Sequence, residues 1–182
     1  MTDSEDTFQE ACDLTGTGED QAAHLKKDAL EYAVTCCPNC SCPVPFWQRV
    51  TNADPHCPQC GFLLWCRKRT VNDVVVLDAT PGRTPGVEDI ESLCNSIVWP
   101  NHIPRVLVNL GDLEHVTSGF LAGLITLGRY LNNAGGALVL CSLCPLVRTV
   151  FHRTHVDTLF AISRDEEEGL IRLQPGVGCG LH

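Results

Sequence analysis

The sequence LVNLGDLEHVTSGFLAGL, residues 107–124, contains the passage from a strand to a helix on which the fold prediction rests. Its first part belongs to the segment 105–110, RVLVNL, in which Val106, Leu107 and Val108 are typical of a strand. Its second part begins a helix that we expect from about Gly119 to Asn132. The apolar residues of this helix recur at helical spacing: Phe120, Leu124, Leu127 and Leu131. The stretch therefore predicts a strand, a short loop and an amphipathic helix.

The same alternation extends along the rest of the second half of the chain. Further strands are expected at 74–77, 137–140 and 159–162. Helices are expected to begin at Thr84-Pro85 (N-cap and N1), at Pro145 (N1), and at a capping box over 163–166. The first of these helices carries one apolar face, made of Val87, Ile90, Leu93 and Ile97. Strands that alternate with helices predict an α/β fold with a mixed, largely parallel sheet.

Two short motifs before this region nearly repeat each other. They read Cys37-Pro38-Asn39-Cys40-Ser41 and Cys57-Pro58-Gln59-Cys60-Gly61, and both pairs have a Cys-x-x-Cys spacing that structural zinc sites use. We predict that Cys37, Cys40, Cys57 and Cys60 hold one zinc ion in a small ribbon. Three flanking residues are competing ligands: Cys36, Cys42 and His56. Iron, held in a similar shell by rubredoxin-type proteins, is the alternative metal; it is disfavoured because the first motif lacks the glycine of the second.

The segment that follows the second motif allows a further prediction. We expect the segment that begins at 62–66 to pair with Val74–Leu77 as the edge strand of the sheet, through a tight turn at Asn72-Asp73. The ribbon and the α/β domain would then be rigidly joined. The basic run 67–69 is interpreted as the outward edge of a strand.

Charge and composition divide the chain and exclude several classes of protein. The net charge is −9, and residues 1–20 hold seven acidic residues and no Lys or Arg. We therefore predict an acidic disordered tail (1–20), a helix at 21–34, a zinc ribbon (35–66), the α/β domain (67–173) and a tail (174–182). Nucleic acid is disfavoured as a partner because basic residues are not clustered. No membrane span or secretion signal is recognised, which predicts a cytoplasmic protein without a membrane partner.

The stretch 107–124 resembles the STAS family, the anti-sigma factor antagonists and their relatives. The resemblance continues through 134–140, 145–151 and 155–160, and covers roughly residues 67–173. It implies a STAS-like fold and phosphorylation of Ser118 by a partner kinase, which would switch binding off. The sequence departs from the family pattern at Thr117, where the family has aspartate, and at Phe120, where it has glycine.

The resemblance also implies a function: a non-enzymatic bacterial signalling module. Its expected partner is an anti-sigma factor or related serine kinase, and a homodimer is a further possibility. The expected partner surface includes Asp112, Glu114, His115 and Phe120.

Several alternatives remain open. Ser118 could be only a helix N-cap, and Thr117 is the rival phosphate acceptor. An adaptor without phosphoregulation is the second functional hypothesis. A serine hydrolase is the third, although no Gly-x-Ser-x-Gly motif accompanies Ser118. The pair Cys141 and Cys144 could bind metal or act in redox chemistry, but Cys144 is better explained as an N-cap.

Overall fold

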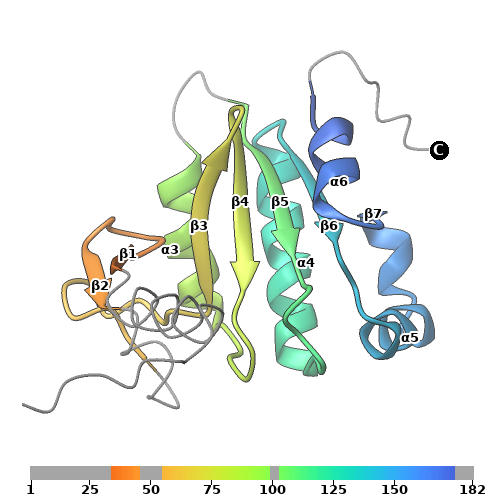
Figure 1. Cartoon of the computed structure of the whole chain (residues 1–182), viewed down its shortest axis with the longest axis horizontal. Helices are drawn as coiled ribbons and strands as arrows, with labels where there is room; N and C mark the ends of the chain where they lie inside the picture. Colours follow the sequence, from red (N-terminus) through yellow and green to blue (C-terminus); the bar gives the residue numbers. More distant parts are fainter. Residues whose placement is uncertain (1–33, 46–54, 99–102, 175–182) are drawn as a thin grey trace, which may run out of the picture. The chain divides into compact units, whose positions relative to one another are not determined.

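The computed structural model describes residues 34–45, 55–98 and 103–174 (Figure 1). The expected acidic tail, nearly all of the helix at 21–34 and nearly all of the C-terminal tail lie outside these ranges. The described residues all belong to one compact unit, so the cysteine-rich segment and the α/β domain are described together.

The α/β domain is built on a five-stranded sheet in the order β3-β4-β5-β6-β7. Its strands are β3 (Cys66–Val71), β4 (Val74–Ala79), β5 (Arg105–Asn109), β6 (Ala137–Cys141) and β7 (Ala161–Ser163). β3 pairs with β4 in antiparallel fashion, and the other three pairings are parallel. The predicted mixed, largely parallel sheet is confirmed.

Helices cover both faces of this sheet. They are α3 (Val87–Ile97), α4 (Ser118–Asn133), α5 (Pro145–Arg153) and α6 (Glu166–Arg172), with a 3₁₀ turn at Val156–Leu159. α3 and α4 lie side by side against one face, as Figure 1 shows. α6 packs against β5, β6 and β7 on the other face. Side chains on successive strand residues point to opposite faces, so each face has its own apolar cluster.

The two clusters differ in size. The larger one joins the sheet to α3, α4 and α5, and includes Leu77, Val106, Leu124, Leu127, Leu131 and Phe151. The smaller one lies under α6 and includes Val74, Val76, Leu107, Val139, Cys141 and Leu173. The predicted apolar face of the 119–132 helix is confirmed, since Phe120, Leu124, Leu127 and Leu131 are all buried.

The predicted hairpin between β3 and β4 is confirmed. Its two turn residues, Asn72 and Asp73, have φ values of 48° and 65°, the left-handed conformation that a two-residue type I′ turn requires. Asn and Asp tolerate this conformation better than other residues with a side chain. The turn fixes the register, with Val71 opposite Val74 and Cys66 opposite Ala79.

Two helix starts and one strand differ from the sequence prediction. α3 was expected to begin at Thr84-Pro85 but begins at Val87, with Gly86 as its N-cap, because the Asp89 carboxylate accepts a hydrogen bond from the Gly86 N–H. Val87, predicted to lie on the buried face, is 63% exposed. α6 has Asp165 as its N-cap instead of Ser163, because Asp165 accepts from the Glu168 N–H. The strand expected at 159–162 begins at Ala161, because the 3₁₀ turn occupies the residues before it.

Candidate functional site

The four predicted cysteines lie in two knuckles with the same hydrogen-bond pattern. In the first, Cys37 N donates to Cys42 O (2.8 Å) and Ser41 N to Cys37 O (3.0 Å). In the second, Cys57 N donates to Phe62 O (2.8 Å) and Gly61 N to Cys57 O (2.9 Å). The first knuckle is closed by the short hairpin of β1 (Val34–Cys36) and β2 (Pro43–Pro45).

The argument against iron from the missing glycine is not supported by the backbone. Ser41, with φ of 61°, adopts the same left-handed conformation as Gly61, with φ of 72°. Both knuckles therefore make the same turn, and the serine changes nothing in the way the cysteines are presented.

The four sulfur atoms converge on one point. All lie within 4.8 Å of one another; Cys37 Sγ is 3.7 Å from Cys60 Sγ, and Cys40 Sγ is 3.6 Å from Cys57 Sγ. A tetrahedral site with metal–sulfur bonds of about 2.3 Å separates its sulfurs by about 3.8 Å. The donor set therefore fits a metal ion. The competing ligands Cys36, Cys42 and His56 are not part of this cluster, and Cys42 Sγ instead donates to Pro43 O at 3.5 Å.

The environment of the sulfurs is uneven. Cys37 and Cys57 are 1% and 2% exposed, whereas Cys40 and Cys60 are exposed. Burial raises the pKa of the Cys37 thiol. Burial also acts to raise the pKa of Cys57, but backbone hydrogen bonds from Cys60 and Gln59 outweigh it and lower that pKa to about 7. Cys57 therefore offers a thiolate near neutral pH, the form that binds metal.

The ribbon formed by these two knuckles contacts the α/β domain through α3. Ser96 Oγ shares its hydrogen between Leu93 O (2.8 Å), in its own helix, and Pro38 O (3.3 Å), inside the first knuckle. Leu63 N, directly after the second knuckle, donates to Asp89 Oδ1 at 3.1 Å. Figure 1 shows the ribbon strands beside β3 and α3. The two knuckles are thus each tied to α3 by one hydrogen bond.

The second candidate region is the N-terminus of α4. Thr117 is the N-cap, and its hydroxyl accepts from Phe120 N at 3.1 Å. Ser118 is the first residue of the helix and is exposed. The alternative that Ser118 is the N-cap is therefore wrong, because the hydroxyl of Thr117 already fills that role. The Thr117 hydroxyl also lies 2.9 Å from the hydroxyl of Thr84.

The loop before α4 borders a cavity of about 460 Å³. Its walls come from residues 81–84, residues 112–117 and Phe120, so the four predicted partner-surface residues Asp112, Glu114, His115 and Phe120 all lie on it. The charged and polar ones are exposed, whereas Phe120 is 3% exposed. Its ring packs against Trp65 with an edge-to-face geometry, at a centroid distance of 6.1 Å and an interplanar angle of 82°.

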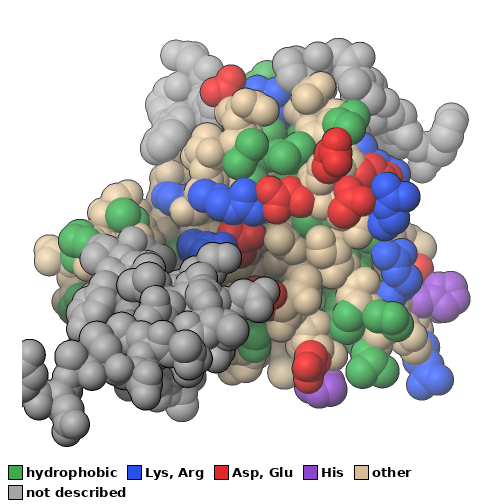
Figure 2. Space-filling model, in the orientation of Figure 1, with side chains coloured by type: hydrophobic (Ala, Val, Ile, Leu, Met, Phe, Trp, Pro, Cys, Tyr) green, Lys and Arg blue, Asp and Glu red, His purple; other side chains and the backbone are tan. Residues whose placement is uncertain are grey.

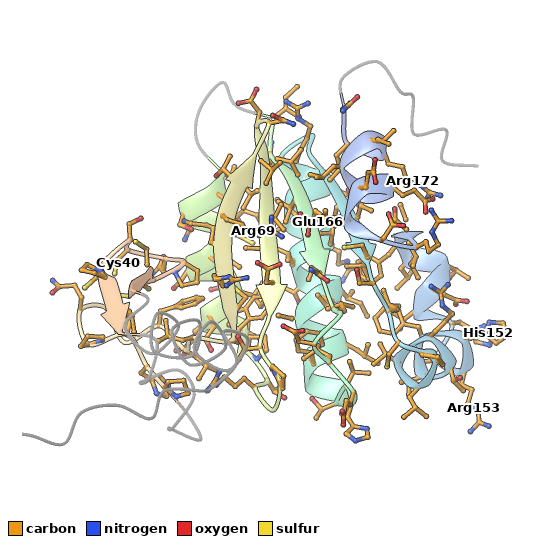
Figure 3. All side chains as sticks on the ribbon, viewed as in Figure 1. Cys40, Arg69, His152, Arg153, Glu166 and Arg172 are labelled. Atoms are coloured by element: carbon orange, nitrogen blue, oxygen red, sulfur yellow. The ribbon has the colours of Figure 1, made fainter. Side chains whose placement is uncertain are left out.

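The structure also places the cysteine pair near α5 and a histidine beside it. Cys144 is the N-cap of α5, as predicted, and Cys141 is buried at the end of β6. His152 lies at the end of α5 (Figure 3), where its ring nitrogen is 3.1 Å from an Asp157 carboxylate oxygen. None of these residues lies within the cavity beside α4.

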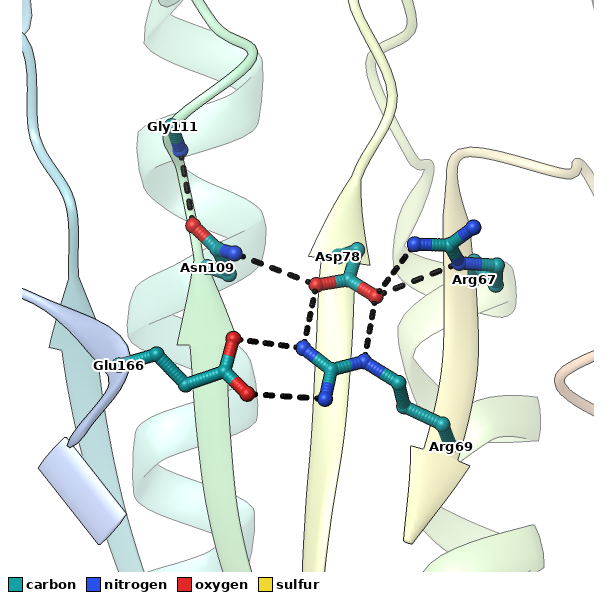
Figure 4. A network of polar contacts seen from close by, with 6 residues as sticks. All are labelled: Arg67, Arg69, Asp78, Asn109, Gly111 and Glu166. Carbon is teal, nitrogen blue, oxygen red and sulfur yellow. Dashed lines mark hydrogen bonds and ion pairs between the residues drawn. The ribbon is translucent and has the colours of Figure 1, made fainter. Parts of the chain in front are cut away.

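A polar network on the sheet face that carries α6 was not predicted. Asp78, at the end of β4, accepts hydrogen bonds from Arg67, Arg69 and Asn109 at 2.9–3.3 Å (Figure 4). Arg69 also forms a two-pronged ion pair with Glu166 of α6, at 2.9 and 2.7 Å. Figure 2 shows the basic and acidic side chains as one band across this face. The predicted strand edge is confirmed, but Arg67 and Arg69 face the sheet's own acid.

The two arginines stabilise the ionised form of Asp78. Burial raises the pKa of Asp78, but the hydrogen bonds and charges of Arg69, followed by those of Arg67, outweigh it, so the pKa lies below its ordinary value. The only sequence signal for this cluster was the i, i+2 spacing of the two arginines, which places both on one face of β3.

The comparisons with known proteins agree with this architecture. No family model matches the chain. The proposed anti-sigma factor antagonist BtrV of Bordetella bronchiseptica is 33% identical over 63 residues, which are 35% of this chain and 54% of BtrV. The chain thus spans about half the length of this relative.

Solved structures extend the likeness to the whole α/β domain. A proposed anti-sigma factor antagonist from Thermotoga maritima superposes with a TM-score of 0.52 at 18% identity, over 60% of this chain and 95% of its own. The α/β domain has the STAS fold. A chain of the stressosome, described as a signal integration and transduction hub, matches with a TM-score of 0.51 at 21% identity, over 58% and 94% of the two chains. In the described part of the chain, no helix is long and apolar enough to cross a bilayer.

Proposed function

We propose that the protein is a non-enzymatic signalling protein of the anti-sigma factor antagonist type, acting in the cytoplasm. It binds an anti-sigma factor or a related serine kinase through the loop 111–118 and the helix α4. The observation that carries this proposal is the placement of Ser118. It is an exposed hydroxyl at the start of α4, beside a cavity, on a domain with the STAS fold.

The position of Ser118 suits reversible phosphorylation. A phosphate there adds a charge of about −1.5 to −2, which the N-terminus of a helix tolerates through its dipole and free N–H groups. Thr117 is the poorer acceptor, because its hydroxyl already caps the helix and contacts Thr84. At a partner interface the same charge is costly unless the partner supplies a cation. Phosphorylation of Ser118 would therefore release the partner without unfolding the helix.

Zinc is the metal we propose for the four-cysteine site. Four protein sulfurs leave no open coordination position, so the metal stabilises the ribbon and does no chemistry on a substrate. The sulfur separations of 3.6 and 3.7 Å are close to those of a tetrahedral shell, which supports a single ion. The proposed function thus combines a metal-stabilised ribbon with a protein-binding STAS domain.

The test of the switch is a set of substitutions at the start of α4. Zinc-loaded protein is incubated with ATP and an anti-sigma factor kinase from the same cell, and the phosphorylated residue is located by mass spectrometry. We expect phosphate on Ser118 and weaker kinase binding for Ser118→Asp, while Ser118→Ala binds constitutively. Thr117→Asp is compared singly and together with Ser118→Asp.

Other outcomes favour the alternatives. Equal affinity of wild type, Ser118→Asp and Thr117→Asp for the kinase would contradict the switch and favour the adaptor. Ester hydrolysis that is lost in Ser118→Ala would favour the hydrolase.

A further inference from the structure

The N-terminus of α4 is connected to the ribbon by two separate sets of contacts. One is apolar and the other is polar, and both run through residues that follow the second knuckle. Neither set involves the cysteines directly. Together they place the metal site and Ser118 at opposite ends of one continuous series of packed and hydrogen-bonded groups.

The apolar connection is the contact between Trp65 and Phe120. Trp65 is fully buried and lies on the segment between the second knuckle and β3. Phe120, the third residue of α4, presents its ring to Trp65 in the edge-to-face geometry described above. Aromatic pairs of this kind have preferred mutual orientations. A displacement of Trp65 would therefore shift the ring of Phe120. The N–H of Phe120 is the group that donates to the Thr117 hydroxyl in the helix cap.

The polar connection runs through Asp89 and Thr84. Asp89 accepts from Leu63 N with one oxygen (3.1 Å) and from Gly86 N with the other (2.9 Å). This carboxylate therefore joins the exit of the second knuckle to the loop before α3. In that loop, the hydroxyl of Thr84 lies 2.9 Å from that of Thr117, the N-cap of α4.

The loop that carries Thr84 lies unusually close to α4. A Cβ added at Gly119 would come within 2.9 Å of Thr84 Cγ2, a separation that real Cβ atoms essentially never show. Gly119 is adjacent to Ser118. The absence of a side chain at this one position lets the Thr84 loop rest directly on the first turn of the helix.

We propose that metal binding in the ribbon orders the first turn of α4, with Trp65 and Asp89 as positioning residues between the two. The metal then determines how Ser118 is presented to a partner. This inference deepens the proposed function and rests on both its metal site and its Ser118 switch. The polar and the apolar connection both transmit the effect of the metal to the first turn of α4. Loss of one connection weakens this ordering, and loss of both removes it.

The test compares the full chain with and without Zn²⁺. Protein is loaded with Zn²⁺ or stripped by a chelator under reducing conditions, and amide hydrogen exchange is followed residue by residue. We expect the amides of Phe120 and Leu121 to exchange about tenfold faster after stripping, because the first turn opens locally. The amide of Val139, in the middle of the sheet, should change by less than about twofold. Re-addition of Zn²⁺ should restore the slow exchange.

A matched pair of threonine substitutions separates positioning from general stability. Thr84→Val removes the hydroxyl that meets Thr117, and should speed the exchange of Phe120 even with Zn²⁺ bound. Thr126→Val removes a hydroxyl on the same helix that donates to Ala122 O and lies outside the connection. It should leave the exchange of Phe120 and its response to Zn²⁺ unchanged.

Two results would overturn the inference. One is equal exchange of Phe120 and Leu121 in loaded and stripped protein. The other is an acceleration of Val139 as large as theirs, which would mean general unfolding. Either result leaves the phosphorylation of Ser118 in the zinc-loaded protein untouched. Absence of phosphate on Ser118 would contradict the proposed function, and it would leave the response of the Phe120 and Leu121 amides to Zn²⁺ unchanged.

Discussion

The ribbon and the α/β domain belong to one compact unit but are held together by different forces. The described part of the ribbon has two strands of three residues each, and its buried apolar side chains, Val44 and Trp65 among them, belong to the larger cluster of the domain instead of forming a core of their own. The α/β domain has a sheet with apolar clusters on both faces. Apolar burial scales with area, so the domain can fold on its core while the ribbon depends on its metal.

This difference determines how each region responds to substitution. In the domain, each buried side chain contributes a share and no single one is indispensable. In the ribbon, four sulfur atoms act as a unit, because a tetrahedral site with one ligand missing loses most of its affinity. The domain should therefore respond to substitution in graded steps, whereas the ribbon should respond in an all-or-none manner.

The largest expected effect is the loss of the metal. Purified protein should carry one zinc per chain by elemental analysis, and Cys57→Ser should lose it. Structural zinc contributes on the order of 10 kcal/mol to small metal-binding modules, so ribbon amides should lose their protection from exchange. The sheet should remain folded by circular dichroism. Absence of metal, or a red iron chromophore, would contradict the zinc assignment.

The second effect tests the graded behaviour of the domain. Leu127 is fully buried in α4, and Leu127→Ala should lower the free energy of unfolding by about 2–5 kcal/mol in a denaturant titration. The exposed Arg129→Ala on the same helix should change it by less than about 0.5 kcal/mol. Zinc content should be unchanged in both variants. Release of zinc from native Leu127→Ala would show that the two regions are not distinct.

The third effect comes from the polar network on the sheet. Asp78→Asn should lower the free energy of unfolding by about 1–3 kcal/mol at pH 7, because Arg69 and Arg67 lose a charged acceptor. The pKa of Asp78 is depressed in the folded state, so its contribution is present above the unfolded value of about 3.9 and is lost as pH falls through the folded value. The difference between wild type and Asp78→Asn should therefore shrink in acid. A pH-independent difference would contradict this, and Asp112→Asn, in an exposed loop, serves as the control.

The smallest effects concern the two hydroxyls at the start of α4. Thr117→Val removes the N-cap and should lower the melting temperature by an amount equivalent to about 1 kcal/mol, whereas Thr117→Ser should keep it. Ser118→Ala should cost less than about 0.5 kcal/mol, because Ser118 is exposed and does not cap the helix. A larger loss for Ser118→Ala than for Thr117→Val would reverse the roles given to these residues.

Local patterns allowed most of the fold to be predicted. Helical spacing located α4, proline at N1 located α5, and Asn72-Asp73 located the hairpin, because each of these signals acts within a few residues. The paired knuckles likewise carried enough information to select four sulfurs among twelve cysteines. In each case the tertiary structure agreed with the local preference.

The sequence interpretation failed where the tertiary structure chose between equivalent local options. Thr117 and Ser118 both carry a hydroxyl, and only the position of Phe120 N decides which one caps the helix. Thr84 was predicted to be the N-cap of α3, but its hydroxyl is hydrogen-bonded to the hydroxyl of Thr117. Arg69 and Glu166 are 97 residues apart in the sequence. No local pattern could have paired them, because their meeting depends on the position of α6 over the sheet.

The two-residue turn at Asn72-Asp73 also has a consequence for the order of folding. Its strands are neighbours in the sequence, whereas each parallel pair must first close a long loop that contains a helix or its equivalent. Hairpins of this kind form within about 1–10 µs, well before pairings of high contact order. β3 should therefore be among the first strands to pair during synthesis. The chain that leads out of the second knuckle would then be attached to the sheet from Cys66 onward early in folding, while the position of the preceding Trp65 still depends on the metal.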